Sequence, residues 1–393
     1  MRERIYLGRL EELIKNYQFN LPLSLYLRQE FNKRRNMGSR DRKRTREDIF
    51  SYFRIGKNYP ELGIAERVAI GSFLCNTNRS PESDYILNTH SPFLPEDMSA
   101  SLAVKLEKTK EKFPHFDLGN IFSFASLVST QINIDSFLQS FLKQPKLWIR
   151  VRQEYKDAVL TELTEKKYSF EISTELSNAI SLINSTPVHE LKSYEKGFFE
   201  IQDINSQRCL EDIELHEGDR WWDACAGSGG KSLALLDKQP KLKIIVSDLR
   251  ESSLLNLKNR MKKVSQRIEG IHQLDLSSGQ EAVPGLFEGI LADVPCSGSG
   301  TWARSPEILS SFSETSLIEK YIPLQRKIVQ NLTKALKPKK YLIYITCSVF
   351  RSENEENIRH FEDNFGLKCL SAAYYEGSEL GADTMYRAIL SKS

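Results

Sequence analysis

Two cysteine-containing segments in the C-terminal half of the chain combine reactive groups with strand-end positions. Asp293-Val-Pro-Cys296 follows an apolar run at 289–292, and Thr346-Cys-Ser348 follows another at 341–345. Short apolar runs flanked by loops and helical stretches are typical of buried parallel strands. The carboxyl ends of such strands face the ligand crevice of an open α/β sheet. We therefore expect both thiols to lie where a substrate would bind.

Thiols in a ligand crevice are suited to chemistry on a pyrimidine. Carbon 5 of cytosine is a poor nucleophile, but a thiolate that adds to carbon 6 enables carbon 5 to attack a methyl donor. The reaction needs a nucleophile, an acid near nitrogen 3 and a group that assists release, and we assign these roles to Cys347, Asp293 and Cys296. We expect Lys231 to hold a thiol as its reactive anion. The structural alternative is that both cysteines are small buried core residues.

The other four cysteines, Cys75, Cys209, Cys225 and Cys369, are interpreted as structural. The six cysteines are dispersed and form no C-x-x-C pair. Because this spacing argues against a disulfide framework and against a zinc site, we expect no metal.

A glycine-rich loop stands between an expected strand and an expected helix. Its glycines allow a ligand to approach the backbone, and they leave helix N-terminal amides available as donors. Cys225 stands where a P-loop needs glycine, and the residues after Gly229 do not fit the dinucleotide pattern G-x-G-x-x-G. The third possibility is a loop for S-adenosyl-L-methionine, and the loop alone does not decide among the three. The candidate cofactor-binding residues of the loop are Cys225, Ala226, Gly227, Ser228, Gly229, Gly230 and Lys231.

Three acids end three successive expected strands and favour the S-adenosyl-L-methionine loop. Asp248 follows Asp223 by 25 residues, and its carboxylate is placed to accept hydrogen bonds from both hydroxyls of an adenosine ribose. Asp275 ends the next strand and is assigned to the adenine amino group. Any one of these acids taken alone is more often a helix cap or a surface residue. Their combination with the cysteine segments predicts S-adenosyl-L-methionine as the cofactor.

The order of the patterns predicts three domains. Residues 1–140 read mainly as helices, with a loop at 83–93, and residues 141–205 read as a small α+β module. From 206 to 393 strands and helices alternate, with a long helix at 316–336 and a terminal strand at 386–390. Repeated β-α units of this kind predict an α/β fold with a doubly wound, mostly parallel, Rossmann-like sheet.

Positive charge is concentrated in residues 33–46. This segment carries eight basic side chains and one acid, so its net charge is +7. The whole chain has a net charge of +3, so the other residues together carry −4. Such a density suits phosphate binding, although a solvated helix end is the alternative. The candidate RNA-binding residues here are Arg40, Arg42, Lys43 and Arg44.

The composition is that of a globular protein without a membrane segment. No stretch approaches the roughly 20 apolar residues of a membrane span, and the N-terminus lacks the apolar core of a signal peptide. We expect a cytoplasmic protein that does not bind a membrane, and a monomer.

Several segments together resemble the Sun/RsmB-type RNA 5-methylcytosine methyltransferases. The matching pieces are 197–207, 223–232, 293–300, Thr346-Cys-Ser348, Glu353-Asn-Glu355 and 381–388, so the resemblance covers roughly 145–393. It implies an S-adenosylmethionine-dependent methyltransferase sheet with Cys347 as nucleophile and Cys296 in release. It also implies a cofactor site at Cys225 to Lys231, Asp248, Asp275 and Asp293.

The chain departs from the family pattern at three positions. Gly227-Ser228 replaces the usual Ala-Pro, which we expect to loosen the loop, and Arg351 replaces a proline after the Thr-Cys-Ser motif. Trp302 follows the Pro-Cys loop and is a candidate for stacking on an RNA base, with core packing as the alternative.

The N-terminal residues resemble a second known domain. Residues 38–42 and 48–54 are similar to the NusB-like helical domain attached to RsmB-type enzymes. This likeness implies an RNA-binding domain and a cytidine of small-subunit ribosomal RNA as substrate. The middle module then resembles a small RNA-binding insert, with Gln202, Asp203 and Gln207 at its junction.

Two other functions remain open at this point. A DNA cytosine-5 methyltransferase would use the Pro-Cys thiol, Cys296, for attack and would leave Cys347 unexplained. A non-catalytic ribosome-assembly factor that binds RNA would need neither thiol nor cofactor.

Overall fold

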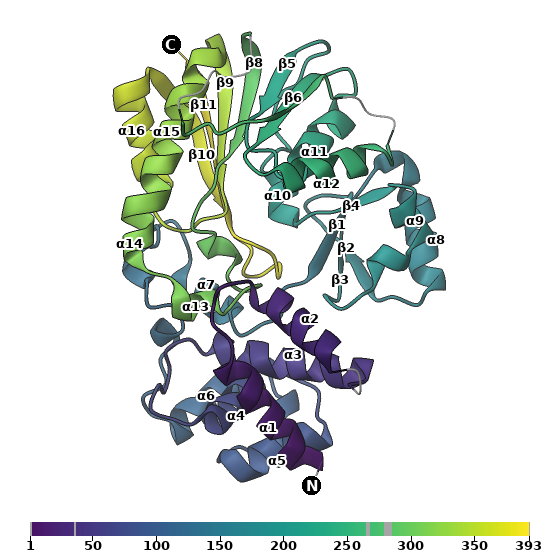
Figure 1. The fold of residues 1–393 in the computed structure, drawn as a ribbon, viewed down its shortest axis with the longest axis vertical. Coiled ribbons are helices and arrows are strands. Elements are labelled where there is room, and N and C mark those ends of the chain that lie inside the picture. Colours follow the sequence, from purple (N-terminus) through teal and green to yellow (C-terminus); the bar gives the residue numbers. More distant parts are fainter. Residues whose placement is uncertain (1, 35–36, 265–267, 279–284, 393) are drawn as a thin grey trace. The chain divides into compact units, whose positions relative to one another are not determined.

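The computed structural model describes residues 2–34, 37–264, 268–278 and 285–392, which form two compact units (Figure 1). The first unit consists of Met1–Ser126, Asn133–Gln144 and Thr301–Ser313. The second consists of Leu127–Ile132, Pro145–Gly300 and Glu314–Ser393. The small module and the large sheet, which the sequence analysis separates at 205, therefore belong to the same compact unit.

The first unit is helical. Its α-helices are α1 (Arg2–Lys15), α2 (Leu23–Lys33), α3 (Ser39–Arg54), α4 (Ile64–Cys75), α5 (Pro81–His90), α6 (Leu102–Lys112), α7 (Ile134–Ser140) and the short α13 (Ile308–Ser311). Helices α3 and α4 approach closely at Gly71, where a Cβ atom would lie 2.3 Å from the carbonyl oxygen of Ser51. This close approach accounts for a glycine within an otherwise apolar helix.

The loop expected at 83–93 is wrong over most of its length, because α5 extends to His90. The Ser80 hydroxyl accepts a hydrogen bond from the Ser83 amide, and Pro81 occupies the first turn, where no intrahelical amide bond is needed. The proline that suggested a loop, Pro92, lies beyond the end of the helix.

The small module of the second unit is a four-stranded antiparallel sheet in the order β2-β3-β1-β4. Its elements are β1 (Leu147–Val151), α8 (Lys156–Glu165), β2 (Phe170–Ile172), β3 (Ala179–Leu182), α9 (Lys192–Glu195), β4 (Phe199–Ile201) and α10 (Ile204–Arg208). Val159 and Leu163 of α8 are fully buried against Ile149 and Ile180 of the sheet. The module therefore has its own apolar core.

The large sheet has the order β10-β11-β9-β8-β5-β6-β7. Its strands are β5 (Arg220–Asp223), β6 (Lys243–Asp248), β7 (Gly270–Gln273), β8 (Phe287–Asp293), β9 (Leu336–Thr346), β10 (Leu367–Tyr375) and β11 (Met385–Lys392). The five strands from β9 to β7 are parallel, whereas β11 and β10 are antiparallel additions at one edge. The predicted Rossmann-like, mostly parallel sheet is confirmed, and β11 contains the predicted terminal strand.

Helices cover both faces of this sheet (Figure 1). Trp222 points to the face covered by α15 (Ile322–Leu332) and α16 (Glu355–Phe365), whereas its neighbour Trp221 points to the face covered by α11 (Gly230–Lys238) and α12 (Glu251–Met261). Both tryptophans are at most 1% exposed. Because successive side chains of β5 point to opposite faces of the sheet, this central strand packs into an apolar core on each side.

The long helix expected at 316–336 is confirmed as a continuous helical stretch from Glu314 to Ala335, but only part of it is regular α-helix. The short α14 (Glu314–Ser316) and a π-helical turn at Leu317–Tyr321 come before α15, and a 3-10 turn at Thr333–Ala335 follows it. Pro323 lies in the first turn of α15, and a proline cannot donate the amide hydrogen bond that a continuous α-helix needs there.

Gly289 provides a test of the central strand packing. It pairs with Trp221 across the β5–β8 ladder, and a Cβ atom at Gly289 would lie 2.2 Å from the indole. We expect Gly289→Ala to lower the free energy of unfolding of the second unit by about 1–3 kcal/mol. Chemical denaturation followed by tryptophan fluorescence measures this decrease. Gly8→Ala is the control, because nothing lies within 4 Å of a Cβ there; equal stability of both variants would contradict the packing argument.

Candidate active site

The two cysteine segments meet at the carboxyl ends of adjacent parallel strands. Asp293 ends β8 and Thr346 ends β9, and the ladder continues past the strands because the Val294 amide donates to the Ile345 carbonyl at 3.1 Å. The Sγ atoms of Cys296 and Cys347 lie 3.3 Å apart. The structure thus brings together the two thiols that the sequence analysis selected.

A lysine and an aspartate accompany Cys347. Lys231, in the first turn of α11, donates from Nζ to Asp293 Oδ2 at 2.5 Å, and its side chain is 11% exposed. Burial acts against the ammonium charge, but the Asp293 carboxylate outweighs it, and the pKa of Lys231 is raised above its ordinary value. Negative charge on Cys347 adds to this increase in the pKa of Lys231. A thiolate at Cys347 and the ammonium therefore stabilise each other.

The second thiol has the opposite electrostatic environment. The pKa of Cys296 is raised well above that of an ordinary thiol by its hydrogen bond with Cys347, by burial, and by the charges of Cys347 and Glu353. Two adjacent sulfurs cannot both ionise easily, and these surroundings keep the proton on Cys296. The pair is asymmetric: one sulfur interacts with a cation, and the other remains a neutral thiol.

The glycine loop is held between β5 and β6. The Gly227 amide donates to Asp248 Oδ2 at 2.8 Å, and the Gly229 amide donates to the Ala226 carbonyl at 2.8 Å. Gly227 and Gly229 have φ of 54° and 82°, in the region that favours glycine. A Cβ atom at Gly229 would meet Leu257 at 2.7 Å, whereas one at Gly227 would meet nothing within 4 Å. The backbone at Gly227 is therefore open to a ligand.

The strand-end acids differ in their surroundings. Asp248 is 8% exposed, and its Oδ1 accepts from the Arg250 amide at 2.8 Å. Asp275 lies two residues beyond β7 and accepts from the amide and hydroxyl of Ser277, and these bonds lower its pKa. Asp223 lies beneath the loop, where burial raises its pKa to about 7. Open loop backbone beside a buried strand-end carboxylate fits the amino-acid and ribose parts of S-adenosyl-L-methionine.

The loop residue Ser228 is held by an arginine that sequence reasoning missed. Arg260 of α12 donates from Nη1 to the Ser228 carbonyl at 2.8 Å and to its hydroxyl at 3.0 Å. Glu200 of β4 accepts from Arg260 at 2.7 Å and from Arg152 at 3.2 Å. No sequence motif marks Arg260, because these contacts join segments that are far apart in the chain.

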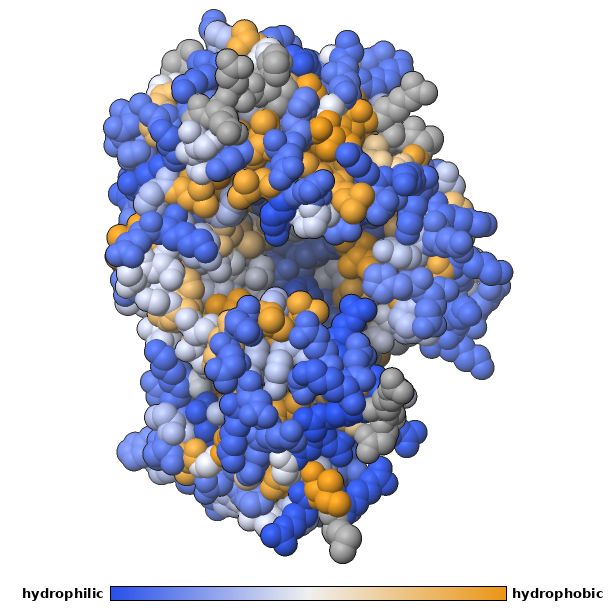
Figure 2. Space-filling model, in the orientation of Figure 1, coloured by the Kyte–Doolittle hydropathy of each residue, from blue (hydrophilic) through white to orange (hydrophobic). Residues whose placement is uncertain are grey.

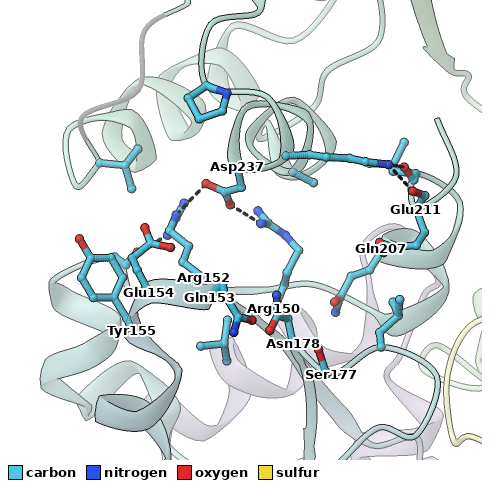
Figure 3. A pocket seen from close by; sticks show the side chains of 18 of the residues that line it. Arg150, Arg152, Gln153, Glu154, Tyr155, Ser177, Asn178, Gln207, Glu211 and Asp237 are labelled. Carbon is cyan, nitrogen blue, oxygen red and sulfur yellow. Dashed lines mark hydrogen bonds and ion pairs between the residues drawn. The ribbon is translucent and has the colours of Figure 1, made fainter. Parts of the chain in front are cut away.

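A cavity of about 550 Å³ lies between the small sheet and α11 (Figure 3). Arg150 and Arg152 point from β1 and its end toward Asp237 of α11, and both pair with its carboxylate. Lys238, which also lines the cavity, donates to backbone carbonyls of Leu210 and Glu211. Each of these cations has partners within the protein, although Nη2 of Arg150 is buried without a hydrogen-bond partner among the residues that the structure describes. The cavity therefore lies at a charged contact between the module and the sheet.

Two of the predicted RNA-binding residues are buried and are corrected here. Trp302, in the first unit, is 0% exposed, and its ring packs against Phe122, Phe124 and Phe312. It therefore offers no face to a base, and the alternative of core packing holds. Gln202 is 7% exposed and accepts from Arg150 Nε at 2.7 Å, so it is part of the charged joint.

The predicted basic segment covers the end of α2 and the start of α3. Arg40 and Lys43 are exposed, whereas Arg42 donates to the Met37 carbonyl and Arg44 forms an ion pair with Glu82. Arg35 of the same segment lies outside the described residues. Figure 2 shows mostly hydrophilic side chains on the viewed face of this unit. Of the four predicted residues, Arg40 and Lys43 are thus the two whose side chains are exposed.

Among the described residues, no helix is long and apolar enough to cross a membrane.

Residues 211–389 match the family model described as 16S rRNA methyltransferase RsmB/F. A protein named ribosomal RNA small subunit methyltransferase B from Photorhabdus laumondii is 30% identical over 244 residues, which are 60% of this chain and 54% of that protein. A protein of the same name from Escherichia coli is 28% identical over 58% of this chain and 53% of its own length. This chain therefore spans about half the length of these curated relatives.

Two solved structures share the fold. One, titled crystal structure of PH0851, has a TM-score of 0.74 at 20% identity and covers 100% of this chain and 99% of its own. The other, NSun6 from Pyrococcus horikoshii with SFG, has a TM-score of 0.60 at 16% identity and covers 69% of this chain and 97% of its own.

Lys231→Met tests the proposed asymmetry of the thiols. Removing the ammonium leaves the Asp293 carboxylate near Cys347 without its counter-ion, so we expect alkylation of Cys347 at neutral pH to slow by about tenfold. Iodoacetamide labelling followed by peptide mass spectrometry measures the rate at each cysteine. Lys238→Met, on the same helix, is the matched control, and an unchanged Cys347 rate in Lys231→Met would remove the lysine from this role.

Proposed function

We propose that the chain is an RNA cytosine-5 methyltransferase that uses S-adenosyl-L-methionine and acts on a cytidine of small-subunit ribosomal RNA. The match of residues 211–389 to the RsmB/F family model supports this proposal. The observation that carries this proposal is the contact of the Cys296 and Cys347 sulfurs at 3.3 Å, beside the Lys231–Asp293 pair. Attack on carbon 6 and later release each need a separate group, and two unequal thiols at one strand edge provide both.

The cofactor would be held by residues 225–231, Asp248, Asp275 and Asp293, and when bound it supplies an electrophilic methyl group. The open backbone at Gly227 accepts the amino-acid part, and Asp248 accepts hydrogen bonds from the ribose. Asp275 is assigned to the adenine amino group.

Cys347 is the nucleophile in this mechanism. Its thiolate is stabilised by the Lys231 ammonium and adds to carbon 6 of cytosine, which places negative charge on the ring around nitrogen 3. The Lys231–Asp293 pair holds a proton between Nζ and Oδ2 and is assigned to give it to nitrogen 3 as that charge develops. Carbon 5 then becomes the nucleophile that accepts the methyl group.

Cys296 is assigned to release of the product. After methylation the carbon 5 proton passes to solvent water, the bond between carbon 6 and the Cys347 sulfur breaks with its electron pair on sulfur, and nitrogen 3 returns its proton to the Lys231–Asp293 pair. A neutral thiol in contact with that sulfur can donate a hydrogen bond to the departing thiolate. In the DNA-methyltransferase assignment Cys296 would attack, but the thiol that interacts with the Lys231 ammonium is Cys347, which favours Cys347 as the nucleophile.

Binding of the RNA is assigned to the first unit and the small module. The similarity of the helical unit to a NusB-like domain and the exposed side chains of Arg40 and Lys43 support a role in docking ribosomal RNA. The small-subunit substrate is supported by the names of the curated relatives.

Substitution of each thiol separates their roles. We expect Cys347→Ala to abolish methylation because no nucleophile remains, and Cys296→Ala to accumulate a covalent protein–RNA adduct because release is impaired. Bisulfite sequencing of RNA from a complemented deletion strain measures methylation, and a slowly migrating gel band reports the adduct. Cys369→Ala, on β10, is the control. A cytosine that is methylated equally with Cys347→Ala would overturn the assignment of the nucleophile.

The basic segment is tested by the salt dependence of RNA binding. Arg40→Gln together with Lys43→Gln should reduce the slope of log K against log salt by about 0.7–0.9 for each phosphate that the protein no longer neutralises. Arg44→Gln is the comparison, because Arg44 is already paired with Glu82 and should change the slope less. Filter binding to in-vitro-transcribed small-subunit RNA measures the slopes, and an unchanged slope in the double variant would return Arg40 and Lys43 to a solvated surface.

A further inference from the structure

We infer that Glu353 is a positioning residue for the two thiols: its buried carboxylate joins the loop after Cys296 to the loop after Cys347. Glu353 lies in the turn before α16 and is 0% exposed. It belongs to the Glu353-Asn-Glu355 segment, to which the proposed mechanism gives no role. The inference rests on the proposed function for its catalytic meaning.

The carboxylate contacts the residue that follows each cysteine. Its Oε1 accepts from the Ser297 amide at 2.8 Å, and its Oε2 accepts from the hydroxyls of Ser297 and Ser348, both at 2.5 Å. Ser297 and Ser348 are themselves 8% and 0% exposed. One side chain therefore accepts hydrogen bonds from both loops at the positions next to the sulfurs.

A buried glutamine extends the same connection to the proline of the first loop. Gln325 of α15 is 0% exposed and donates from Nε2 to Glu353 Oε1 at 2.8 Å and to the Pro295 carbonyl at 3.0 Å. Asn357 of α16 donates to Gln325 Oε1 at 2.7 Å and fixes the amide orientation. The Glu353–Gln325 pair thus forms hydrogen bonds with the residues on both sides of Cys296, Pro295 and Ser297.

The four donors to Glu353 are all uncharged. A buried carboxylate without a cation partner costs more than a neutral residue unless several hydrogen bonds satisfy it. A purely structural junction between two loops could be formed by apolar side chains. A carboxylate here has a further consequence, because its charge is one of the causes that keep the pKa of Cys296 high, after the Cys347 contact and burial.

The connection explains why two sulfurs on separate loops remain in contact. Each sulfur lies beyond the last paired residue of its strand, where the sheet itself no longer fixes the backbone. Displacement by about 1 Å can cost about a hundredfold in rate when reacting groups must be aligned. Glu353 acts through Ser297 and Ser348, so we expect its removal to change the distance between the sulfurs while both sulfurs stay present.

The decisive experiment measures the contact of the sulfurs directly. Diamide oxidises two adjacent thiols to a disulfide and is itself reduced to the hydrazine, so the rate of Cys296–Cys347 disulfide formation reports how often the sulfurs meet. We expect Glu353→Gln to slow this reaction by about tenfold, because the amide places a donor against the donors of the loops. Peptide mass spectrometry of the full-length protein measures the disulfide.

Glu356→Gln is the matched control, since Glu356 lies in the first turn of α16, close to Glu353 in the chain, but pairs with Arg351. If Glu353→Gln formed the disulfide as fast as the wild-type protein, the inference would be overturned. A general loosening of the packing would instead expose the buried Cys209 to alkylation. Faster alkylation of Cys209 in Glu353→Gln than in the wild type, together with a large fall in melting temperature, would therefore also overturn the inference in favour of a structural role.

The catalytic consequence is measured separately. We expect Glu353→Gln to lower kcat by about tenfold or more while KM for RNA and the Kd for S-adenosylhomocysteine stay within about twofold. Wild-type protein that forms the disulfide but does not methylate RNA would contradict the proposed function and leave the positioning of the sulfurs intact. An unchanged kcat in Glu353→Gln, beside an active wild type, would contradict only the role of Glu353.

Discussion

The parallel pairing of β8 with β9 is the constraint on which the site depends. The register places Leu291 beside Ile343 and Asp293 beside Ile345, so both strands end at the same level. A shift of one residue would turn the side chains of a strand to the opposite faces of the sheet and would separate the loops that follow. The apolar cores on both faces of the sheet oppose such a shift, because each strand has buried side chains on both sides. The contact of the sulfurs is therefore a consequence of core packing as much as of the residues around them.

Charge then distinguishes the two sulfurs that the sheet brings together. Lys231 and Asp293 form an ion pair next to Cys347, whereas the charge of the Glu353 carboxylate contributes to the raised pKa of Cys296. Ion pairs of this kind contribute little net stability once the cost of desolvation is included. The main effect of this pair is therefore electrostatic, on the neighbouring thiol. The same chemical group therefore has two different electrostatic environments, with a cation beside Cys347 and a raised pKa at Cys296. This difference is what a mechanism with separate attack and release requires.

The sequence predicted the sheet and its strand ends because buried parallel strands are short, apolar and uniform. It also predicted the edge at which Cys296 and Cys347 lie, since the carboxyl ends of parallel strands share one edge. Contacts between distant segments left no comparable signal. Trp302 comes two residues after the Pro-Cys loop, yet its ring is enclosed by phenylalanines of the helical unit. Helix α5 was missed because the stretch 83–93 is largely polar and contains Pro92, which lies just beyond the end of the helix at His90.

The glycine loop shows how a departure from a family pattern is accommodated by tertiary contacts. The likeness to the family led us to expect that Gly227-Ser228, in place of Ala-Pro, loosens this loop, because proline restricts the backbone directly. Here Arg260 binds both the carbonyl and the hydroxyl of Ser228, and Glu200 of the small module orients the guanidinium. Where a proline would restrict the loop backbone by its own ring, Arg260 of α12 and Glu200 of β4 restrict it here by hydrogen bonds. The small module is consequently part of the support of the loop, which agrees with its placement in the same compact unit as the large sheet.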